Sequence, residues 1–150
     1  MRKKHILYLA ALLCLAFTAC AGKNSTPPLQ QLAGNWAINF EESFTESTIY
    51  NELLANYPEE ARDFKNFFSG MVMAFDIEEG VSTAFLTDGD TQSFSFIVVS
   101  GSTPGSPLVL EIGGATMRFD ISGDRLQIYE ANENLAEAEP PLVLYRQTDK

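Results

Sequence analysis

Carboxylates are the side chains with which this sequence could do chemistry, because Asp and Glu make up 20 of its 150 residues. Two carboxyl groups can act as acid and base in glycoside hydrolysis, but spacing along the chain does not give their separation. Asp88 and Asp90, on either side of Gly89, and the pair Asp120 and Asp124 could offer oxygens to calcium. Calcium needs six or more oxygens from a defined loop, which neither stretch supplies. We interpret both as turns and expect no metal site, no cofactor and no catalytic residue.

Histidine and cysteine are confined to the first 20 residues, at His5, Cys14 and Cys20. A domain without imidazole and thiol groups cannot build the usual zinc sites. It also cannot build a Ser-His-Asp or Cys-His relay. We therefore expect that the folded part of the chain is not an enzyme and has no disulfide.

The first 19 residues have the order of a secretory signal peptide. Basic residues occupy positions 2–4, residues 6–17 are almost all apolar, and two small residues precede Cys20. This order indicates secretion followed by cleavage. Residues 6–19 are shorter than the roughly 20 apolar residues that a membrane-spanning helix needs. We predict that residues 1–19 are a signal peptide rather than a permanent span.

Residues 17–20, Phe-Thr-Ala-Cys, resemble the lipobox of bacterial lipoproteins. The resemblance implies that Cys20 becomes the lipidated first residue of the mature protein. Ala21 follows it rather than Asp, which in enteric-type bacteria implies sorting to the outer membrane. We expect a lipid-anchored protein of the bacterial cell envelope, on the outer membrane and facing the periplasm. An ordinary secreted protein is the alternative.

Removal of the signal peptide leaves a strongly acidic protein. Residues 20–150 keep seven basic and 20 acidic residues, a net charge of −13. This charge repels phosphate backbones, so we exclude nucleic acid as a partner. It also opposes electrostatic adhesion to an anionic bilayer, so the lipid must hold the protein on the membrane.

The mature chain is long enough for one domain with a sizeable core. Residues 20–31 contain a Ser-Thr-Pro-Pro run and few large apolar side chains. We predict that they are the lipidated cysteine and a flexible tether, and that residues 32–150 form the folded domain.

The domain begins with a strand in which Trp36, Ile38 and Phe40 share one face. Two helices should follow. Thr45 or Ser47 suits the N-cap of the first, and Pro58 suits the start of the second, which should end near residue 70. Apolar residues then alternate in seven segments, placed at 71–77, 81–85, 94–98, 108–112, 115–121, 126–128 and 142–146. The pattern predicts a mainly β domain, an eight-stranded antiparallel barrel with α-helices inserted after strand one.

The segment 29–32 before Gly34, Asn35 and Trp36 resembles the opening of lipocalins, a short turn that leads into a G-x-W motif. In lipocalins this Trp packs at the closed end of the barrel against an Arg near the last strand. The resemblance thus implies that Trp36 stacks on Arg146. Residues 29–147 are more similar to a group of small uncharacterised bacterial lipoproteins described as lipocalin-like. That group implies a lipocalin-like barrel for residues 32–150 and no known activity.

Ten phenylalanines in the mature chain suggest an aromatic interior. Eight-stranded barrels can enclose one small molecule, so the first hypothesis is non-catalytic binding of a small apolar or amphipathic ligand. The candidate cavity walls are Trp36, Phe75, Phe85, Phe94, Phe96 and Phe119.

The alternative is a structural or protein-interaction role in the envelope. The rings would then fill a packed barrel, and the acidic surface would contact another envelope protein, for example through the loop 131–141. The acidic residues in and beside this loop are Glu130, Glu133, Glu137 and Glu139. A cavity of about 300 Å³ or more favours the ligand, whereas an exposed apolar patch on a filled barrel favours the protein partner.

Overall fold

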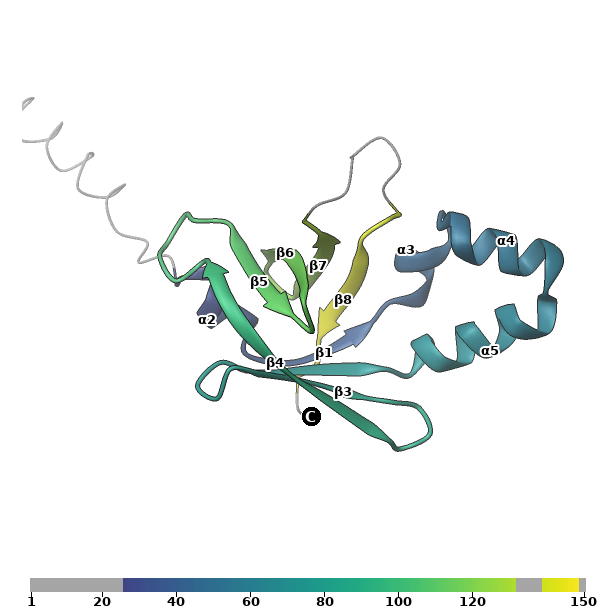
Figure 1. Cartoon of the computed structure of the whole chain (residues 1–150), viewed down its shortest axis with the longest axis horizontal. Helices are drawn as coiled ribbons and strands as arrows, with labels where there is room; N and C mark the ends of the chain where they lie inside the picture. The colour runs from purple at the N-terminus through teal and green to yellow at the C-terminus, as the bar shows by residue number, and fades with distance from the viewer. Residues whose placement is uncertain (1–25, 132–138, 149–150) are drawn as a thin grey trace, which may run out of the picture.

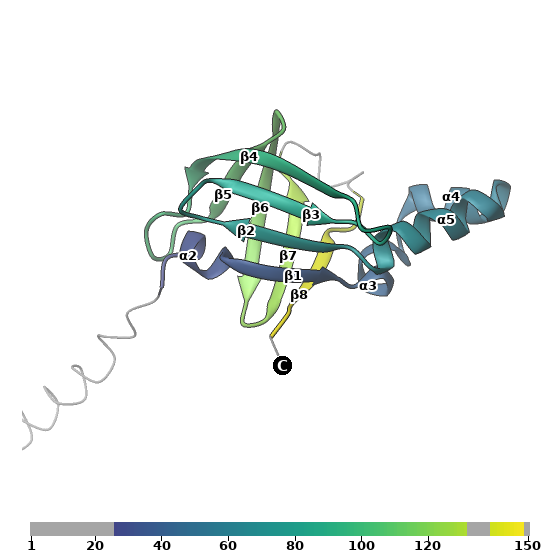
Figure 2. The same cartoon turned by 90° about the horizontal axis from the view of Figure 1, so that it is seen from below.

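The computed structural model describes residues 26–131 and 139–148. The predicted signal peptide, Cys20, Glu133 and Glu137 lie outside the described residues. Within the described ranges, eight strands form one closed antiparallel barrel, which confirms the predicted fold (Figures 1 and 2). They are β1 (Gly34–Ile38), β2 (Val72–Asp76), β3 (Val81–Phe85), β4 (Thr91–Ser100), β5 (Leu108–Ile112), β6 (Ala115–Ser122), β7 (Arg125–Glu130) and β8 (Leu142–Arg146).

Each strand pairs with the next along the chain, and β8 closes the barrel on β1. In this last pair Trp36 lies opposite Arg146 and Ile38 lies opposite Leu144. Short turns make the meander possible. Between β5 and β6, Gly113 and Gly114 have φ values of 59° and 86°, and two residues with positive φ form the hairpin turn that fits strand twist.

Alternation along the strands builds one core inside the barrel. Leu110, Leu126 and Leu144 are fully buried, and the rings of Phe75 and Phe119 meet edge to face at 5.9 Å. Each such side chain contributes about 1.5–3 kcal/mol of burial. The buried residues of this cluster are Leu32, Trp36, Ile38, Met71, Phe75, Phe96, Leu108, Leu110, Phe119, Leu126, Ile128 and Leu144.

Three helices connect β1 to β2: α3 (Phe40–Phe44), α4 (Thr48–Asn56) and α5 (Pro58–Ser69). Ser47 caps α4 by accepting a hydrogen bond from the Tyr50 amide at 3.1 Å, and Pro58 begins α5, as predicted. The placement of Phe40 in the first strand was wrong. Asn39 accepts a hydrogen bond from the Glu42 amide at 3.2 Å and so starts α3 one residue after β1.

Helices α4 and α5 pack on each other and project from the barrel as an arm, which we call the helical arm (Figures 1 and 2). Its base is held by aromatic rings. Phe44 meets Phe64 at 5.0 Å and Phe68 at 4.9 Å, and Phe40 meets Tyr50 at 5.0 Å. Five of the 11 phenylalanines in the sequence therefore form or border a second core, Phe40, Phe44, Phe64, Phe67 and Phe68.

Residues 28–31, which the sequence predicts to be part of the flexible tether, are helical in the structure. Residues 28–31 belong to helix α2 (Pro28–Leu32), which packs against one end of the barrel. Pro28 fits the first turn because its missing amide hydrogen is not needed there, and Leu32 is fully buried in the barrel core. Helix α2 thus packs with the barrel as part of the described structure.

Candidate functional site

One end of the barrel is sealed, and we call it the closed end. Leu32 of α2 and Trp36 of β1 are both fully buried there. The Trp36 indole donates a hydrogen bond from Nε1 to the Leu32 carbonyl at 2.8 Å, so the polar edge of the ring is satisfied inside the core. Helix α2 and the tryptophan together fill this end.

Arg146 on β8 contacts Trp36 and the backbone before β1 at the closed end. Its guanidinium carbon lies 4.2 Å from the centroid of the Trp36 ring, which is the stacking that the lipocalin resemblance implies. The guanidinium also donates to the Ala33 carbonyl at 2.8 Å and to the Gln31 carbonyl at 2.5 Å. One side chain on β8 therefore ties the last strand to the residues that lead into β1.

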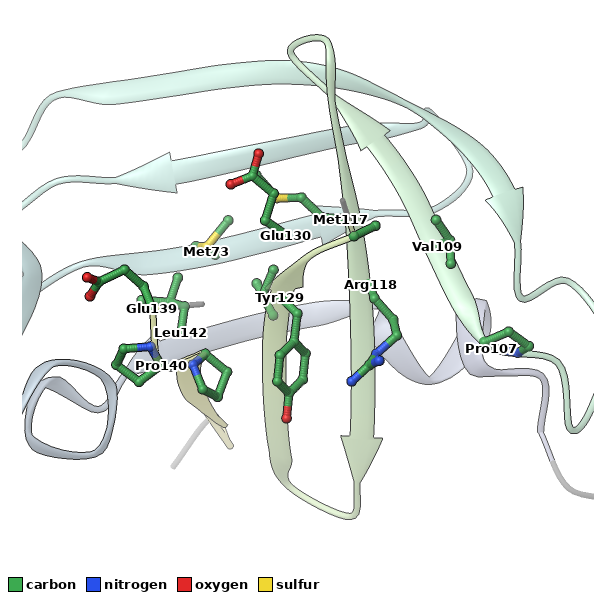
Figure 3. Close-up of a pocket in the computed structure, with 13 residues that line it drawn as sticks. Met73, Pro107, Val109, Met117, Arg118, Tyr129, Glu130, Glu139, Pro140 and Leu142 are labelled. Atoms are coloured by element: carbon green, nitrogen blue, oxygen red, sulfur yellow. The ribbon is translucent and has the colours of Figure 1, made fainter. Parts of the chain in front are cut away.

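A pocket with a volume of about 670 Å³ lies at the opposite end of the barrel, which we call the open end (Figure 3). Its inner wall is apolar and comes from four strands. Met73 lies on β2, Met117 on β6, Ile128 on β7 and Leu142 on β8. Unbranched methionines adapt their shape to an irregular apolar ligand, which makes this wall suitable for one.

The pocket also extends onto the outer surface of the barrel. Consecutive residues of β6 and β7 line it, and consecutive strand residues point to opposite faces, so only part of the volume is inside the barrel. The outer part is lined by Pro107, Val109, Arg118 and Tyr129.

Arg118 occupies the outer part beside Tyr129, as Figure 3 shows, with its guanidinium carbon 4.4 Å from the ring centroid. Its Nη2 lies 3.0 Å from Asp120 Oδ2, and its buried Nε has no hydrogen-bond partner among the described residues. The outer part of the pocket therefore contains the Arg118 guanidinium, which already contacts the Tyr129 ring and the Asp120 carboxylate.

The rim of the inner part is acidic. Glu130 is the last residue of β7 and pairs with Met117 of β6. Directly paired residues lie on the same face of a sheet, so Glu130 is on the inward face, as Met117 is. Glu139 comes from the other side of the β7–β8 loop, and its Oε2 accepts a hydrogen bond from the Thr48 amide at 3.1 Å. This bond joins the rim of the pocket to the first residue of α4. An apolar wall below two carboxylates suits an amphipathic molecule.

A second carboxylate cluster holds α3 against the barrel. Glu42 accepts hydrogen bonds from the Tyr145 hydroxyl at 2.8 Å and from Arg125 Nη2 at 2.9 Å. The Tyr145 bond, followed by the Arg125 bond, holds the pKa of the Glu42 carboxyl below its usual value. The Lys65 ammonium of α5, 2.9 Å from the adjacent Glu41 carboxylate, lowers the pKa of Glu41. The Glu41–Lys65 and Glu42–Arg125 pairs hold the helices between β1 and β2 in position. None of these four described residues lines the pocket at the open end.

The six candidate wall residues lie elsewhere. Trp36, Phe75, Phe96 and Phe119 are buried in the barrel core, and none of the six is among the described residues that line the pocket at the open end. Phe94 faces the same side as the buried Ser82 but is 46% exposed near the β5–β6 turn.

The assignment of Phe85 to the wall was wrong. Ser82 and Ala84 are the inward residues of β3, so Phe85 faces outward and is 44% exposed. Successive residues of a strand face opposite sides of the sheet, so an error of one residue in the expected alternation moves a side chain to the other face. In β3 there are too few large apolar residues for the sequence to show which set faces inward.

The Asp-containing turns have internal partners. Asp88 Oδ1 accepts a hydrogen bond from the Asp90 amide at 3.0 Å, and Asp124 lies 3.7 Å from Arg146 Nε. Across residues 26–131 and 139–148, no group of three or more His, Cys, Asp or Glu side chains could hold a metal ion. In the same part of the chain, no helix is long and apolar enough to cross a membrane.

Comparison with known proteins adds no relative, since no family model and no curated protein matches the chain.

Proposed function

We propose that this chain is a lipid-anchored protein of the bacterial cell envelope that binds a small apolar or amphipathic molecule, without catalysis, at the open end of its barrel. The observation that carries the proposal is the inner part of the pocket, which has an apolar wall and two carboxylates at its rim. Small-molecule sites in proteins are typically concave and mostly apolar, with a few polar groups that orient the ligand.

The packing of the barrel limits the shape of the ligand. The closed half is filled by the barrel core around Trp36 and Leu126, so a ligand reaches only the open half. Its apolar part would contact Met73, Met117 and Leu142, and its polar part would lie near Glu130 and Glu139. A compact apolar group fits this geometry better than a long acyl chain.

The envelope location is supported by the sequence. Residues 1–19 have the order of a lipoprotein signal peptide, and Cys20 stands where such proteins receive their lipid. The lipocalin-like arrangement, with a helical insertion after strand one, supports kinship with the small bacterial lipoproteins that the sequence resembles. We propose the outer membrane, facing the periplasm, as the site of the anchor.

Titration with 1-N-phenylnaphthylamine, an uncharged apolar dye that fluoresces in apolar surroundings, tests the ligand site. We expect saturable binding to the chain. The double variant Met73→Gln, Met117→Gln should weaken it by about tenfold, which corresponds to about 1.4 kcal/mol. Leu54→Gln, at an exposed position on the helical arm, is the matched control and should bind normally. A chain that gives no saturable signal would refute the proposal.

A protein-interaction role is the second candidate, and the helical arm favours it. Ile49, Leu54, Tyr57 and Phe67 are large apolar side chains that the arm exposes to solvent. Glu52, Glu59, Glu60 and Asp63 lie on the same two helices. The arm would thus suit a basic envelope protein with an apolar groove. A photo-crosslinker at position 54 should then yield one defined adduct in whole cells, lost when Ile49 and Tyr57 are replaced by Gln.

A further inference from the structure

The end of β4 carries an exposed apolar strip, residues 97–99, which we call the β4 strip. Ile97, Val98 and Val99 are 63%, 36% and 58% exposed. Three adjacent apolar residues with this exposure are unusual in a strand, because alternation normally buries every second one. The strip lies within residues 91–110, a stretch of 20 residues that contains no charged side chain.

The strip is exposed because β4 continues beyond the last of its residues that pairs with β3. Pairing between β3 and β4 ends at Ser95, and the Phe96 amide makes one more bond, to the Gly80 carbonyl at 2.8 Å. Beyond this point β4 pairs with β5 alone, and a bulge between Val98 and Ser100 breaks the alternation. Side chains on both faces of the strand therefore reach solvent.

The β4 strip lies at the end of the barrel where the N-terminal chain arrives. The Leu29 amide of α2 donates a hydrogen bond to the Gly101 carbonyl at 3.1 Å, two residues beyond the strip. Figures 1 and 2 both show α2 beside the end of β4, with the helical arm at the far side of the molecule. Thr26, the first described residue, is six positions along the chain from Cys20. Six residues span at most about 20 Å, so a lipid on Cys20 brings this end of the barrel close to the bilayer.

The charges around the strip leave its surface open to lipid. Glu111 is the closest by register, since it lies opposite Ile97 on β5, and it is exposed. Asp76 ends β2, and Glu78 and Glu79 lie on the β2–β3 turn, next to Gly80, whose carbonyl accepts the hydrogen bond of the Phe96 amide. Asp120 is on β6, and Asp124 is on the β6–β7 turn. Glu111 is therefore the carboxylate directly opposite the strip, and the β2–β3 turn is an acidic neighbour of its first residue.

We propose that the β4 strip rests on the surface of the bilayer that holds the Cys20 lipid, and that it fixes the orientation of the barrel on the membrane. The proposal depends on the lipid anchor and is independent of any ligand in the pocket. A tether this short confines the domain to the surface, so a small apolar area is enough to choose the face that touches it. The helical arm then points away from the contact.

Nitroxide quenching on vesicles tests this orientation. The full chain, extracted from membranes with its lipid, carries an NBD fluorophore on Val99→Cys and is placed in phosphatidylcholine vesicles whose headgroups bear nitroxide. Leu54→Cys, on the helical arm, is the matched control because its side chain is also exposed. We expect about threefold or more stronger quenching at position 99, because an interfacial contact lies within about 5–10 Å of the headgroup boundary.

A comparison of two labelled proteins tests whether the apolar side chains of the strip cause the contact with the bilayer. The fluorophore is placed on Ser95→Cys, an exposed position on the same strand, with and without Ile97→Thr and Val99→Thr. Threonine keeps the strand propensity and removes much of the apolar surface, so quenching should fall in the double variant. Glu111→Gln should increase it, because it removes the carboxylate nearest to the lipid.

Three results would overturn the proposal. Equal quenching at positions 99 and 54 would mean that the strip does not face the bilayer. A fluorophore at position 99 that is shielded from water but not quenched would mean that a protein covers the strip, either a second copy or another envelope protein. A chain that leaves the vesicles, with no acyl mass on Cys20, would remove the anchor on which the proposal depends.

Discussion

Replacement of Arg146 by Ala tests how the barrel is closed. The guanidinium lies 4.2 Å from the Trp36 ring centroid and donates hydrogen bonds to the Gln31 and Ala33 carbonyls. A cation–π contact at a partly exposed site contributes about 1 kcal/mol, and a hydrogen bond from a charged group about 1.5 kcal/mol or more. The ion pair with Asp124, at 3.7 Å and with an exposed carboxylate, adds almost nothing. We expect Arg146→Ala to lower the free energy of unfolding by about 2–4 kcal/mol, a large share of the 5–15 kcal/mol typical of a domain.

Urea unfolding at pH 7 measures this loss, and the chain contains its own probe. Trp36 is the only tryptophan and is fully buried, so its emission reports the closed end directly. Arg146→Lys keeps the charge but loses the two-pronged geometry and should fall between the two proteins. Arg62→Ala, at an exposed position on the helical arm, should change nothing. An unfolding free energy of Arg146→Ala within about 0.5 kcal/mol of the parent, with unchanged Trp36 emission, would refute this account of closure.

Further predictions concern the core, the acid dependence, a glycine and the anchor. Leu126→Ala, at a fully buried position, should cost about 2–5 kcal/mol in urea unfolding, and a smaller loss would mean a looser core. The pKa of Glu42 is lowered from 4.5 in the folded protein, so its stabilisation is complete above pH 4.5 and fades as pH falls through the lowered value. The difference in stability between the parent and Glu42→Gln should therefore shrink from pH 7 to pH 3, and a constant difference would contradict the tie to Arg125. Gly101→Ala should lower the melting temperature, since φ is +111° and a Cβ would lie 2.5 Å from Leu108 Cδ1; an unchanged melting temperature would show that the β4–β5 loop can shift. Cys20→Ser should release the protein from membranes in a fractionation assay, and continued membrane association would mean that the signal segment acts as an anchor.

The barrel could be predicted because its signals are local. Alternating apolar residues set the eight strands, and glycine-containing turns such as residues 113–114 separate them. Ser47 and Pro58 marked the starts of α4 and α5 for the same reason, since caps act within one turn. The closing contact between Trp36 and Arg146 came from the lipocalin resemblance, because 110 residues separate them in sequence.

The pocket could not be predicted in the same way. Aromatic content suggested large rings as its walls, but five of the 11 phenylalanines pack in the helical segment between β1 and β2, where their spacing also fits a helix face. Of the other rings, Phe75, Phe96 and Phe119 are buried in the barrel core. The alternating pattern of each strand places Met73, Met117 and Leu142 on inward-facing positions. Only the pairing register of the strands shows that the three side chains line the same pocket. The depth of a side chain along the barrel axis depends on this register, which no local pattern encodes.

A native mass spectrum is the most direct test of the central claim, that the open end of the barrel holds a small molecule. The full chain is extracted from the envelope of its own host in mild detergent and measured under native and denaturing conditions. We predict an extra mass of one small molecule that is lost on denaturation and is reduced in the Met73→Gln, Met117→Gln variant. A bare protein mass that persists after incubation with host lipid extract would contradict the claim and leave the helical arm as the functional surface.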